Sequence, residues 1–404
     1  MAIQLLQDEK NGARIKVVGV GGGGGNIVTS MVNKGIEGVE FIIINTDAQA
    51  LELNKADVKI AIGKTITKGL GTGMKYEIGK KAVEENRDAI ERHLQESDMV
   101  FVTAGMGGGT GTGGAPEVAR IARAVGALVV AVVTKPFAIE GEKRMQLAEE
   151  GIEKLREEVD SLIVIPNEKI MEFVGNDTSK NEAFDMANRV LYSATRGISQ
   201  IITKPGTINV DFEDVRTIMK GSKNAMIGTG IASGKDRAIQ AASDAIHNPL
   251  LDDMDIAGAK NVLYNIVSNG NIPMKDIEAI GKLIREKVGG TPRIIMGLVD
   301  DEEMGEDVMV TVIATGFESK SEGKTYEETI SYEYKITTLP GADELGKLDT
   351  PAIERRFGKH SKDKIPTDFS EPPSKIKNKT SLEDKGMIPD EDITKPAFLR
   401  KQMD

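Results

Sequence analysis

The chain of 404 residues contains no cysteine and no tryptophan, and it has only three histidines. The absence of cysteine excludes disulfide bonds, thiolate metal sites and a cysteine nucleophile. The histidines, His93, His247 and His360, are far apart in the sequence and near no other metal-ligand cluster, so we expect each at the surface or a helix end. Aromatic residues make up only 4% of the chain, so its cores must be aliphatic.

Long apolar runs and a positive net charge are also missing. The longest apolar run, Ala124–Val133, is far shorter than the about 20 residues that span a bilayer, and the N-terminus lacks the apolar region of a signal peptide. The formal net charge of −11 argues against a general surface for nucleic acids or anionic membranes. We therefore expect a cytoplasmic protein with no nucleic-acid partner and no direct membrane insertion.

What the chain does contain is two glycine-rich runs, each after an apolar segment. Residues 21–26 read GGGGGN, and residues 107–114 read GGGTGTGG. Glycine lacks a Cβ, so such loops turn sharply and bring backbone N–H groups against an anion. Two of them in one parallel sheet can hold a di- or triphosphate from two sides, with the Thr110 and Thr112 hydroxyls as further donors. The runs predict a nucleotide-binding protein.

The segments around these runs alternate between apolar strands and helices, which predicts a parallel sheet covered on both faces. We expect strands at 14–20, 41–44, 58–62, 98–104, 127–134 and 161–165, and helices at 26–34, 75–96 and 115–125. A long helix over 181–202 should connect this Rossmann-like sheet to a second α+β domain. In that domain we expect helices at 215–219, 236–247 and 276–288 and strands at 293–300 and 308–316.

These patterns divide the chain into six parts. They are a flexible extension at 1–12, a nucleotide-binding domain at 13–180, a connecting helix at 181–205, an α+β domain at 206–318, a linker at 319–389 and a peptide at 390–404. The linker has too few apolar residues to offset the entropy of ordering, so we predict that it is disordered. The peptide regains apolar side chains, as partner-binding segments do, although a chance cluster remains open. Its candidate contact residues are Ile393, Pro396, Phe398, Leu399 and Arg400.

A dinucleotide-dependent oxidoreductase is a serious alternative on the first 50 residues. Residues 19–24 fit the GxGxxG pattern, and Asp47 follows the second strand, where that fold places an acid. The second glycine run argues against this oxidoreductase, because a dinucleotide fold needs no second phosphate loop there. A Walker lysine closes neither run, so backbone, hydroxyls, Mg²⁺ and Arg144 must meet the phosphate charge. We expect the helix after the second run to begin at Ala115, with Pro116 in its first turn.

The second glycine run resembles the signature of the tubulin/FtsZ GTPases. Other segments are similar to the family in the same order, namely 22–26, 45–51, 68–71, 134–137, 140–144, 209–214 and 396–401. The resemblance implies a GTPase that binds GTP and GDP, with Mg²⁺ held through the phosphates and by no dedicated side chains. It also implies head-to-tail filaments and a cytokinetic ring at mid-cell in bacterial division. Membrane tethers and division regulators would bind the C-terminal peptide.

The same resemblance implies individual roles. Glu140 would bind the ribose, and Arg144 would lie near the terminal phosphate. Phe184 and Asn188 would contact the guanine. Ordinary core packing is the alternative for Phe184, and a solvated charge run is the alternative for Glu140 and Arg144. The complete predicted GTP-binding set is Gly21, Gly22, Gly23, Gly24, Gly25, Asn26, Gly71, Thr72, Gly107, Gly108, Gly109, Thr110, Gly111, Thr112, Gly113, Glu140, Arg144, Asn167, Phe184 and Asn188.

Asn209, Asp211 and Asp214 are the candidate catalytic residues. The two aspartates are three positions apart near a helix start, so both can face the same way and polarise a water that attacks the γ-phosphate. Helix capping by the aspartates is the alternative. The resemblance implies that they act on GTP held by the neighbouring subunit. A nucleotide-binding regulator that neither polymerises nor hydrolyses GTP is a third possible function.

The chain departs from the family's usual pattern in two places. Residues 71–77 read GTGMKYE, where the family often has GAGANPE in a loop near the γ-phosphate. Nucleotide response or turnover can therefore differ here. Residues 394–395 are inserted in the tail peptide, so its partners can differ from those that the resemblance implies.

Overall fold

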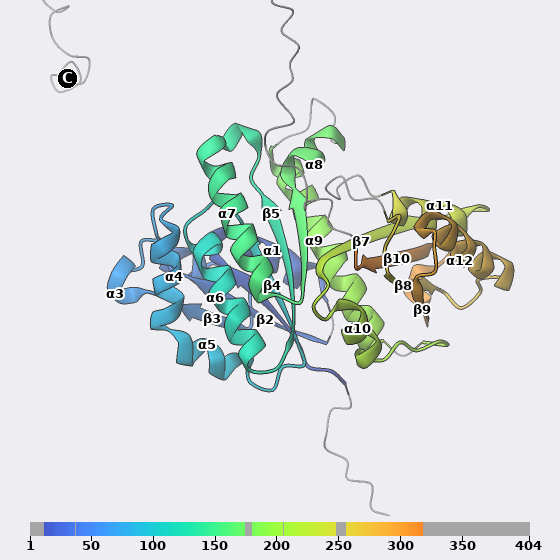
Figure 1. Ribbon diagram of the computed structural model, residues 1–404, viewed down its shortest axis with the longest axis horizontal. Coiled ribbons are helices and arrows are strands. Elements are labelled where there is room, and N and C mark those ends of the chain that lie inside the picture. The colour runs from blue at the N-terminus through green and yellow to red at the C-terminus, as the bar shows by residue number, and fades with distance from the viewer. Residues whose placement is uncertain (1–11, 37, 174–179, 205, 248–255, 318–404) are drawn as a thin grey trace, which may run out of the picture. The chain divides into compact units, whose positions relative to one another are not determined.

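The computed structural model describes residues 12–36, 38–173, 180–204, 206–247 and 256–317. The predicted N-terminal extension (apart from residue 12), linker and tail peptide lie outside the described residues. The N-terminal part holds strands β1 (Ile15–Val20), β2 (Val39–Asn45), β3 (Val58–Ala61), β4 (Met99–Gly105), β5 (Leu128–Lys135) and β6 (Ser161–Pro166). Its helices are α1 (Gly21–Lys34), α2 (Ala48–Glu52), α3 (Lys64–Thr67), α4 (Tyr76–Glu85), α5 (Arg87–Leu94), α6 (Thr110–Ala124), η1 (Ala138–Glu140), α7 (Glu142–Glu158) and α8 (Asn167–Phe173) (Figure 1).

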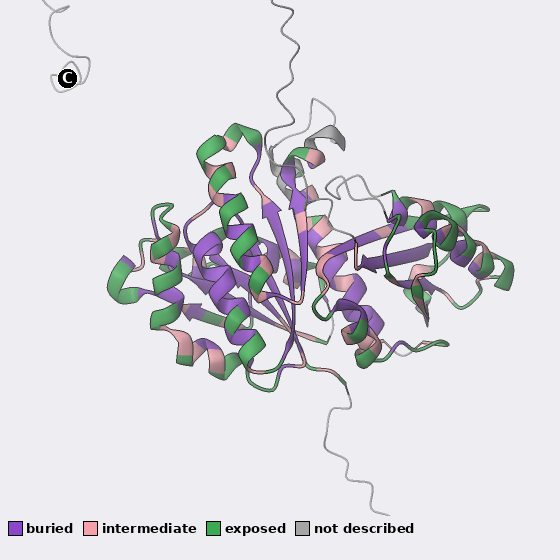
Figure 2. Ribbon diagram, in the orientation of Figure 1, coloured by how far each residue is buried: buried purple, intermediate pink, exposed green. Residues whose placement is uncertain are grey.

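These six strands form a parallel sheet in the order β3-β2-β1-β4-β5-β6. Side chains alternate between its faces, so Val17 and Phe41 join one hydrophobic cluster while Val18 and Ile42 join another. Both faces are covered by helices, and the strands are buried throughout most of their length (Figure 2). The predicted parallel sheet is thereby confirmed.

The second part begins with a long helix and ends in a smaller mixed sheet. Its elements are α9 (Lys180–Thr203), α10 (Phe212–Met219), β7 (Lys223–Ala232), α11 (Arg237–Ile246), β8 (Asn261–Ser268), α12 (Met274–Val288), β9 (Arg293–Asp300), η2 (Glu302–Met304) and β10 (Val308–Thr315). β10 pairs antiparallel with β7 and β8, and β8 pairs parallel with β9. β6 and β7 pair through two residues each, so the strands form one ten-stranded sheet.

Several predicted element boundaries are wrong. α1 begins at Gly21 and α6 at Thr110, so each glycine run enters its helix and Pro116 lies inside α6 rather than in its first turn. Tertiary packing overrides the low helix propensity of glycine, since a Cβ on Gly24 would lie 2.5 Å from the carbonyl oxygen of Thr103. The predicted helix over 75–96 is two helices that meet at Asn86.

Strands β7 and β8 were not predicted. Gly228 and Gly230 interrupt the apolar pattern of β7, and both are there because α11 packs closely on the strand. A Cβ on either glycine would overlap a backbone carbonyl oxygen of α11, at Ala245 and Ala241 respectively. A pattern that is set by the packing of another helix cannot be read from the strand itself.

Candidate functional site

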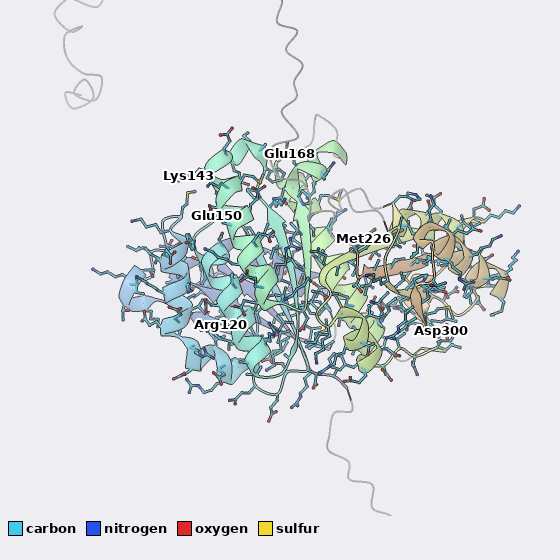
Figure 3. The ribbon with its side chains drawn as sticks, in the orientation of Figure 1. Arg120, Lys143, Glu150, Glu168, Met226 and Asp300 are labelled. Carbon is cyan, nitrogen blue, oxygen red and sulfur yellow. The ribbon has the colours of Figure 1, made fainter. Side chains whose placement is uncertain are left out.

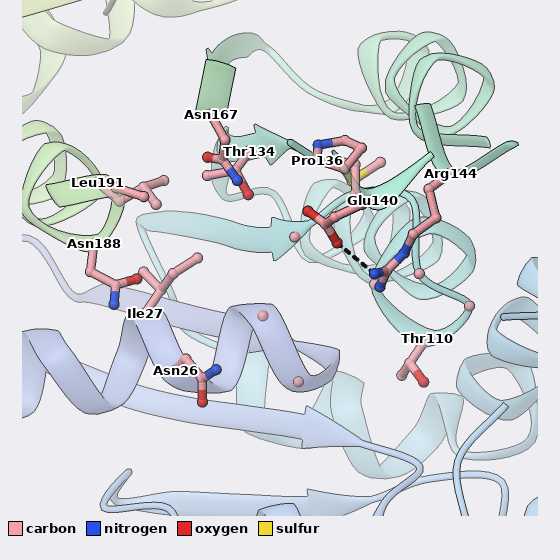
Figure 4. A pocket seen from close by; sticks show the side chains of 18 of the residues that line it. Asn26, Ile27, Thr110, Thr134, Pro136, Glu140, Arg144, Asn167, Asn188 and Leu191 are labelled. Atoms are coloured by element: carbon pink, nitrogen blue, oxygen red, sulfur yellow. Dashed lines mark hydrogen bonds and ion pairs between the residues drawn. The ribbon is translucent and has the colours of Figure 1, made fainter. Parts of the chain in front are cut away.

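A cavity of about 370 Å³ lies where β1, β4 and β5 end (Figure 4). In parallel strands the carboxyl ends meet at one edge of the sheet, which is where ligands bind in such folds. The described residues that line the cavity are Gly22, Gly23, Asn26, Ile27, Thr72, Gly105, Met106, Gly108, Gly109, Thr110, Gly111, Thr134, Pro136, Glu140, Arg144, Asn167, Ala187, Asn188 and Leu191.

Glycines line this cavity for two different reasons. A Cβ on Gly22 or Gly108 would meet no protein atom within 4 Å, so these two positions leave open space for a ligand. A Cβ on Gly23 would lie 2.9 Å from the Cα of Gly105, and one on Gly109 would lie 2.9 Å from the backbone nitrogen of Lys75. The first pair therefore frees room in the cavity, while the second pair lets its walls pack together.

Seven predicted nucleotide-binding residues do not line the cavity: Gly21, Gly24, Gly25, Gly71, Gly107, Thr112 and Gly113. Most of them shape the loops. Gly107 adopts a left-handed conformation with φ of 88°, and its N–H donates to the Thr112 hydroxyl at 2.9 Å. A Cβ on Gly113 would overlap the carbonyl oxygen of Tyr76, so this glycine lets α4 and α6 approach.

Three threonine hydroxyls meet at the start of α6. The Thr110 hydroxyl lies 2.7 Å from that of Thr46 and 3.5 Å from that of Thr72, and all three side chains are buried. Because α6 begins at Thr110, its unpaired N-terminal N–H groups and the positive end of its dipole lie at this point. Hydroxyls and a helix N-terminus together make an anion-binding wall.

The charged residues among the described cavity-lining set are Glu140 and Arg144, and they pair with each other. Arg144 Nη1 lies 2.5 Å from Glu140 Oε2, and Glu140 Oε1 accepts the Phe137 N–H at 2.9 Å (Figure 4). Arg144 Nε is buried with no hydrogen-bond partner within the described part of the chain. Glu168, labelled in Figure 3, holds the same segment by accepting the Ala138 N–H at 2.9 Å.

Amide side chains lie at the other side of the cavity. Asn188 and Leu191 come from α9 and lie opposite Thr110 in the close view (Figure 4). Asn167, at the start of α8, is 5% exposed, and its side-chain oxygen finds no partner among the described residues. A buried acceptor without a partner is a point where a ligand can donate a hydrogen bond. Phe184 belongs to α9, but its side chain lies outside the described residues.

Asp47, the acid on which the oxidoreductase alternative depended, caps a helix. Its Oδ1 accepts the N–H groups of Gln49 at 2.9 Å and of Ala50 at 3.2 Å, at the start of α2. It is not among the described residues that line the cavity. The carboxylate is therefore occupied locally, and the structure does not support a ribose-binding acid at this position.

The candidate catalytic residues do not line the cavity either. Asp211 is the N-cap of α10, where its Oδ1 accepts the Asp214 N–H at 2.8 Å, and Asn209 Oδ1 accepts the Gly206 N–H at 2.6 Å. Capping therefore does occupy Asp211. α9 separates these residues from the cavity, since the 15 residue-to-residue steps from Asn188 to Thr203 rise about 22 Å along a helix.

The predicted set misses seven cavity-lining residues, namely Ile27, Gly105, Met106, Thr134, Pro136, Ala187 and Leu191. It also misses Thr46, which contacts Thr110 without lining the cavity itself. A usable signal existed for part of this set. Gly105 and Thr134 stand at or near the carboxyl ends of two expected strands, which meet at one edge of a parallel sheet. The tail residues proposed to bind partners lie outside the described residues.

Two kinds of structure are absent from the described part of the chain. It contains no group of three His, Asp or Glu side chains that could hold a metal ion. It also contains no helix that combines the length and apolar character needed to cross a bilayer.

The fold and the glycine-lined cavity define the class of tubulin-like nucleotide-binding proteins. The model of the Tubulin/FtsZ family GTPase domain matches residues 14–175, and that of the FtsZ family C-terminal domain matches residues 223–318. These two matches cover more than half of the chain, and they include both glycine runs.

Named relatives agree with the two models. The cell division protein FtsZ of Wigglesworthia glossinidia brevipalpis is 44% identical, over 100% of this chain and 99% of its own length. FtsZ of Buchnera aphidicola (Baizongia pistaciae) is 49% identical over 80% of this chain and 84% of its own. A solved "FtsZ dimer, empty" from M. jannaschii has a TM-score of 0.71 at 44% identity and covers 77% of this chain and 90% of that one. The chain belongs to the FtsZ family.

Proposed function

We propose that this protein is a GTPase that assembles head to tail into filaments and forms the ring of bacterial cell division, hydrolysing GTP between adjacent subunits. One observation carries the proposal: the cavity and the catalytic acids are separate within the chain. The cavity offers anion donors without a water-activating carboxylate, because Glu140 is paired with Arg144. Asp211 and Asp214 offer carboxylates away from the cavity. A second copy of the chain would join the two halves.

The nucleotide lies in the proposed complex with its phosphates at the glycine side and its base at α9. The backbone of Gly22 and Gly108, the Thr110 hydroxyl and the N-terminus of α6 bind the phosphates. Asn188 and the unpartnered oxygen of Asn167 recognise the base edge, because a guanine presents N–H donors there. Glu140 accepts from the ribose, and Arg144 turns towards the terminal phosphate.

A magnesium ion fits this site only as part of the nucleotide complex. The described lining residues supply hydroxyl oxygens, from Thr72, Thr110 and Thr134, amide oxygens of asparagines, and a single carboxylate that is already paired. Mg²⁺ is commonly held through substrate phosphates with few protein ligands. When bound, it would neutralise charge on the phosphates.

Asp211 and Asp214 of one subunit orient and polarise the attacking water over the nucleotide of the next. Asp211 is exposed and Asp214 is half-buried at the start of α10, so both carboxylates are accessible from outside the chain. General acid–base help of this kind contributes about 10²-fold or more to a rate. Loss of the γ-phosphate after hydrolysis would weaken the contact and make assembly reversible.

The cavity rim is suited to a second subunit. Leu70 is 85% exposed, Met74 is 48% exposed and Ile139 is 94% exposed, and each lies within two residues of a cavity-lining residue. Exposed apolar groups beside a functional cavity are typical of interaction surfaces. A head-to-tail contact is heterologous and need not close, so it builds filaments. The FtsZ relative from M. jannaschii is described as a dimer, which agrees with self-association.

The partners of the assembled protein remain a sequence-based proposal. We propose that residues 390–404 bind membrane tethers and division regulators, which would bring the filaments to the mid-cell membrane without insertion of this chain. Ile393, Pro396, Phe398, Leu399 and Arg400 are the side chains expected to make these contacts.

The test is the GTPase rate per molecule as a function of protein concentration. The wild-type protein should show a threshold, because isolated subunits lack the second half of the site. Asp214→Asn should bind GTP with wild-type affinity and turn over about 10²-fold more slowly. Glu213→Gln is the matched control, since it removes one carboxylate charge from the same helix turn and should stay within about twofold of wild type.

Complementation separates a shared site from a complete one. Gly108→Ser should block the cavity but retain the acids, whereas Asp214→Asn retains the cavity but lacks one acid. Each variant alone should be nearly inactive, and an equal mixture should regain part of the activity. A mixture of folded variants that stays inactive, or a dilute monomer that hydrolyses GTP at the full rate, would contradict the proposal.

A further inference from the structure

We propose that Lys75 binds the terminal phosphate of the nucleotide and makes the site prefer a triphosphate over a diphosphate. The inference rests on the proposed function and identifies a specificity-determining residue for it. Lys75 stands in the loop in which this chain departs from the usual family pattern, where asparagine is often found.

The backbone of Lys75 is fixed against the cavity wall. Its N–H donates to the carbonyl oxygen of Thr72 at 3.2 Å, and Thr72 lines the cavity. Its nitrogen also lies 2.9 Å from the point that a Cβ on Gly109 would occupy, and Gly109 lines the cavity too. Lys75 itself is not among the lining residues, but two of its immediate neighbours are.

The neighbouring residues hold this loop in one shape. Gly71, Gly73 and Met74 have φ angles of 83°, 58° and 64°, so the loop turns sharply before Lys75 begins α4 as its N-cap. Gly79, one turn along α4, packs directly against Gly109. A Cβ on Gly79 would overlap the carbonyl oxygen of Gly109. The helix start is thereby fixed beside the second glycine run.

The Lys75 side chain is available to a ligand. It is exposed, and among the described residues no hydrogen bond or ion pair to its ammonium group is present. Glu77, the acid in the same first turn of α4, is also exposed, and no ion pair joins it to Lys75. The flexible four-carbon stem of lysine lets an ammonium group move from solvent to an anion nearby.

The terminal phosphate is the part of the nucleotide that this ammonium can reach. The base side of the cavity is at Asn188, and Thr110 and Thr72 lie at the opposite side, so the end of the phosphate chain approaches the loop of Lys75 (Figure 4). The formal charges of the described lining residues sum to zero, because they comprise one glutamate, Glu140, and one arginine, Arg144. Lys75 therefore adds a cation where the triphosphate carries its extra charge and the diphosphate does not.

The experiment measures equilibrium affinities for GTP and GDP by competition, at protein concentrations below the assembly threshold. Lys75→Gln should weaken GTP binding by about tenfold at low ionic strength, the loss of one hydrogen bond to a charged group, and leave GDP within about twofold. Lys75→Arg should retain the preference. Lys81→Gln is the matched control, because it removes an exposed lysine from the same helix without touching a cavity-lining residue.

Each outcome distinguishes the inference from the proposed function. If Lys75→Gln and Lys81→Gln change GTP affinity equally, or if Lys75→Gln weakens GTP and GDP by the same factor, Lys75 does not read the terminal phosphate, although the protein still binds GTP. If the wild-type protein binds neither nucleotide, the proposed function itself fails. An effect on GTP that shrinks at high salt supports direct charge attraction.

Discussion

The cavity and the start of α10 differ in their chemical groups and in their charge. The cavity is lined by backbone, buried hydroxyls and one ion pair whose charges cancel, and it faces the N-terminus of α6. The start of α10 carries Asp211, Glu213 and Asp214 within four residues. Carboxylates beside the cavity would repel a triphosphate as it enters. In the proposed assembly, this separation would let the nucleotide bind first and meet the acids only when a second subunit arrives.

The largest effect is expected when one carboxylate is removed from the start of α10 and the helix itself is left intact. Asp211→Asn should retain the N-cap, since asparagine caps as well as aspartate does, and should lower turnover by about 10²-fold. Asp211→Ala should lower turnover equally and also destabilise the protein by about 1 kcal/mol, because the Asp214 N–H loses its acceptor. Assembly-dependent GTPase rates and urea unfolding measure the two effects. If Asp211→Asn turns over like the wild type, this residue serves only as a cap.

A smaller effect, on GTP affinity, is expected when a side chain fills the open space at Gly108 in the cavity. Gly108→Ser introduces a side chain that meets no protein atom, so its melting temperature without nucleotide should match that of the wild type. GTP affinity should fall about tenfold or more, because the side chain overpacks the bound phosphate. Gly12→Ser, at another glycine with open space around it but outside the cavity, should change neither quantity. Unchanged GTP affinity in Gly108→Ser would contradict the phosphate site.

The smallest effect concerns an ion pair beyond the end of α9, outside both the cavity and the start of α10. The Lys204 ammonium lies 2.8 Å from Asp301 and, chiefly through this hydrogen bond, lowers the pKa of that carboxyl below its usual value of about 3.9. A lowered folded-state pKa contributes stability that is present above the unfolded-state pKa and is lost as the pH falls through the folded-state pKa.

Lys204→Met should therefore be less stable than wild type at neutral pH, and the difference should shrink as the pH falls below about 4. Urea unfolding across this pH range measures the difference, and Lys204→Arg should retain most of it. GTP affinity should not change in either variant. A stability difference that stays constant with pH would mean that Lys204 acts through packing and not through the charge of Asp301.

The sequence predicts this fold best where a pattern is local. The run of Ile42, Ile43 and Ile44 identifies a strand buried on both faces, and the glycine runs identify the sheet edge where the cavity lies. It predicts less well where another element decides. Close packing against glycines determines the first turns of α1 and α6 and the whole of β7. In the sequence alone, these glycines indicate loops or breaks.

The same division holds for the candidate site. Thr110 and Glu140 lie in recognisable motifs, whereas Thr46 contacts Thr110 only because β2 ends beside the start of α6 in the folded sheet. The pairing of Glu140 with Arg144 follows from their spacing of four residues, but the compensation of charge inside the cavity depends on which other charges the fold brings there. Sequence patterns identify the components, and the fold decides which of them face one another.

The length of α9 has a consequence for any polymer that joins the two halves of the site. Its part from Asn188 to Thr203 separates the cavity from the segment that carries Asp211 and Asp214. In a polymer in which each subunit docks its acids on the nucleotide of the next, the length of this helix would then set the spacing between successive subunits. A bend or a shift in α9 would be repeated at every contact, so a small change in one helix would alter the curvature of an entire filament.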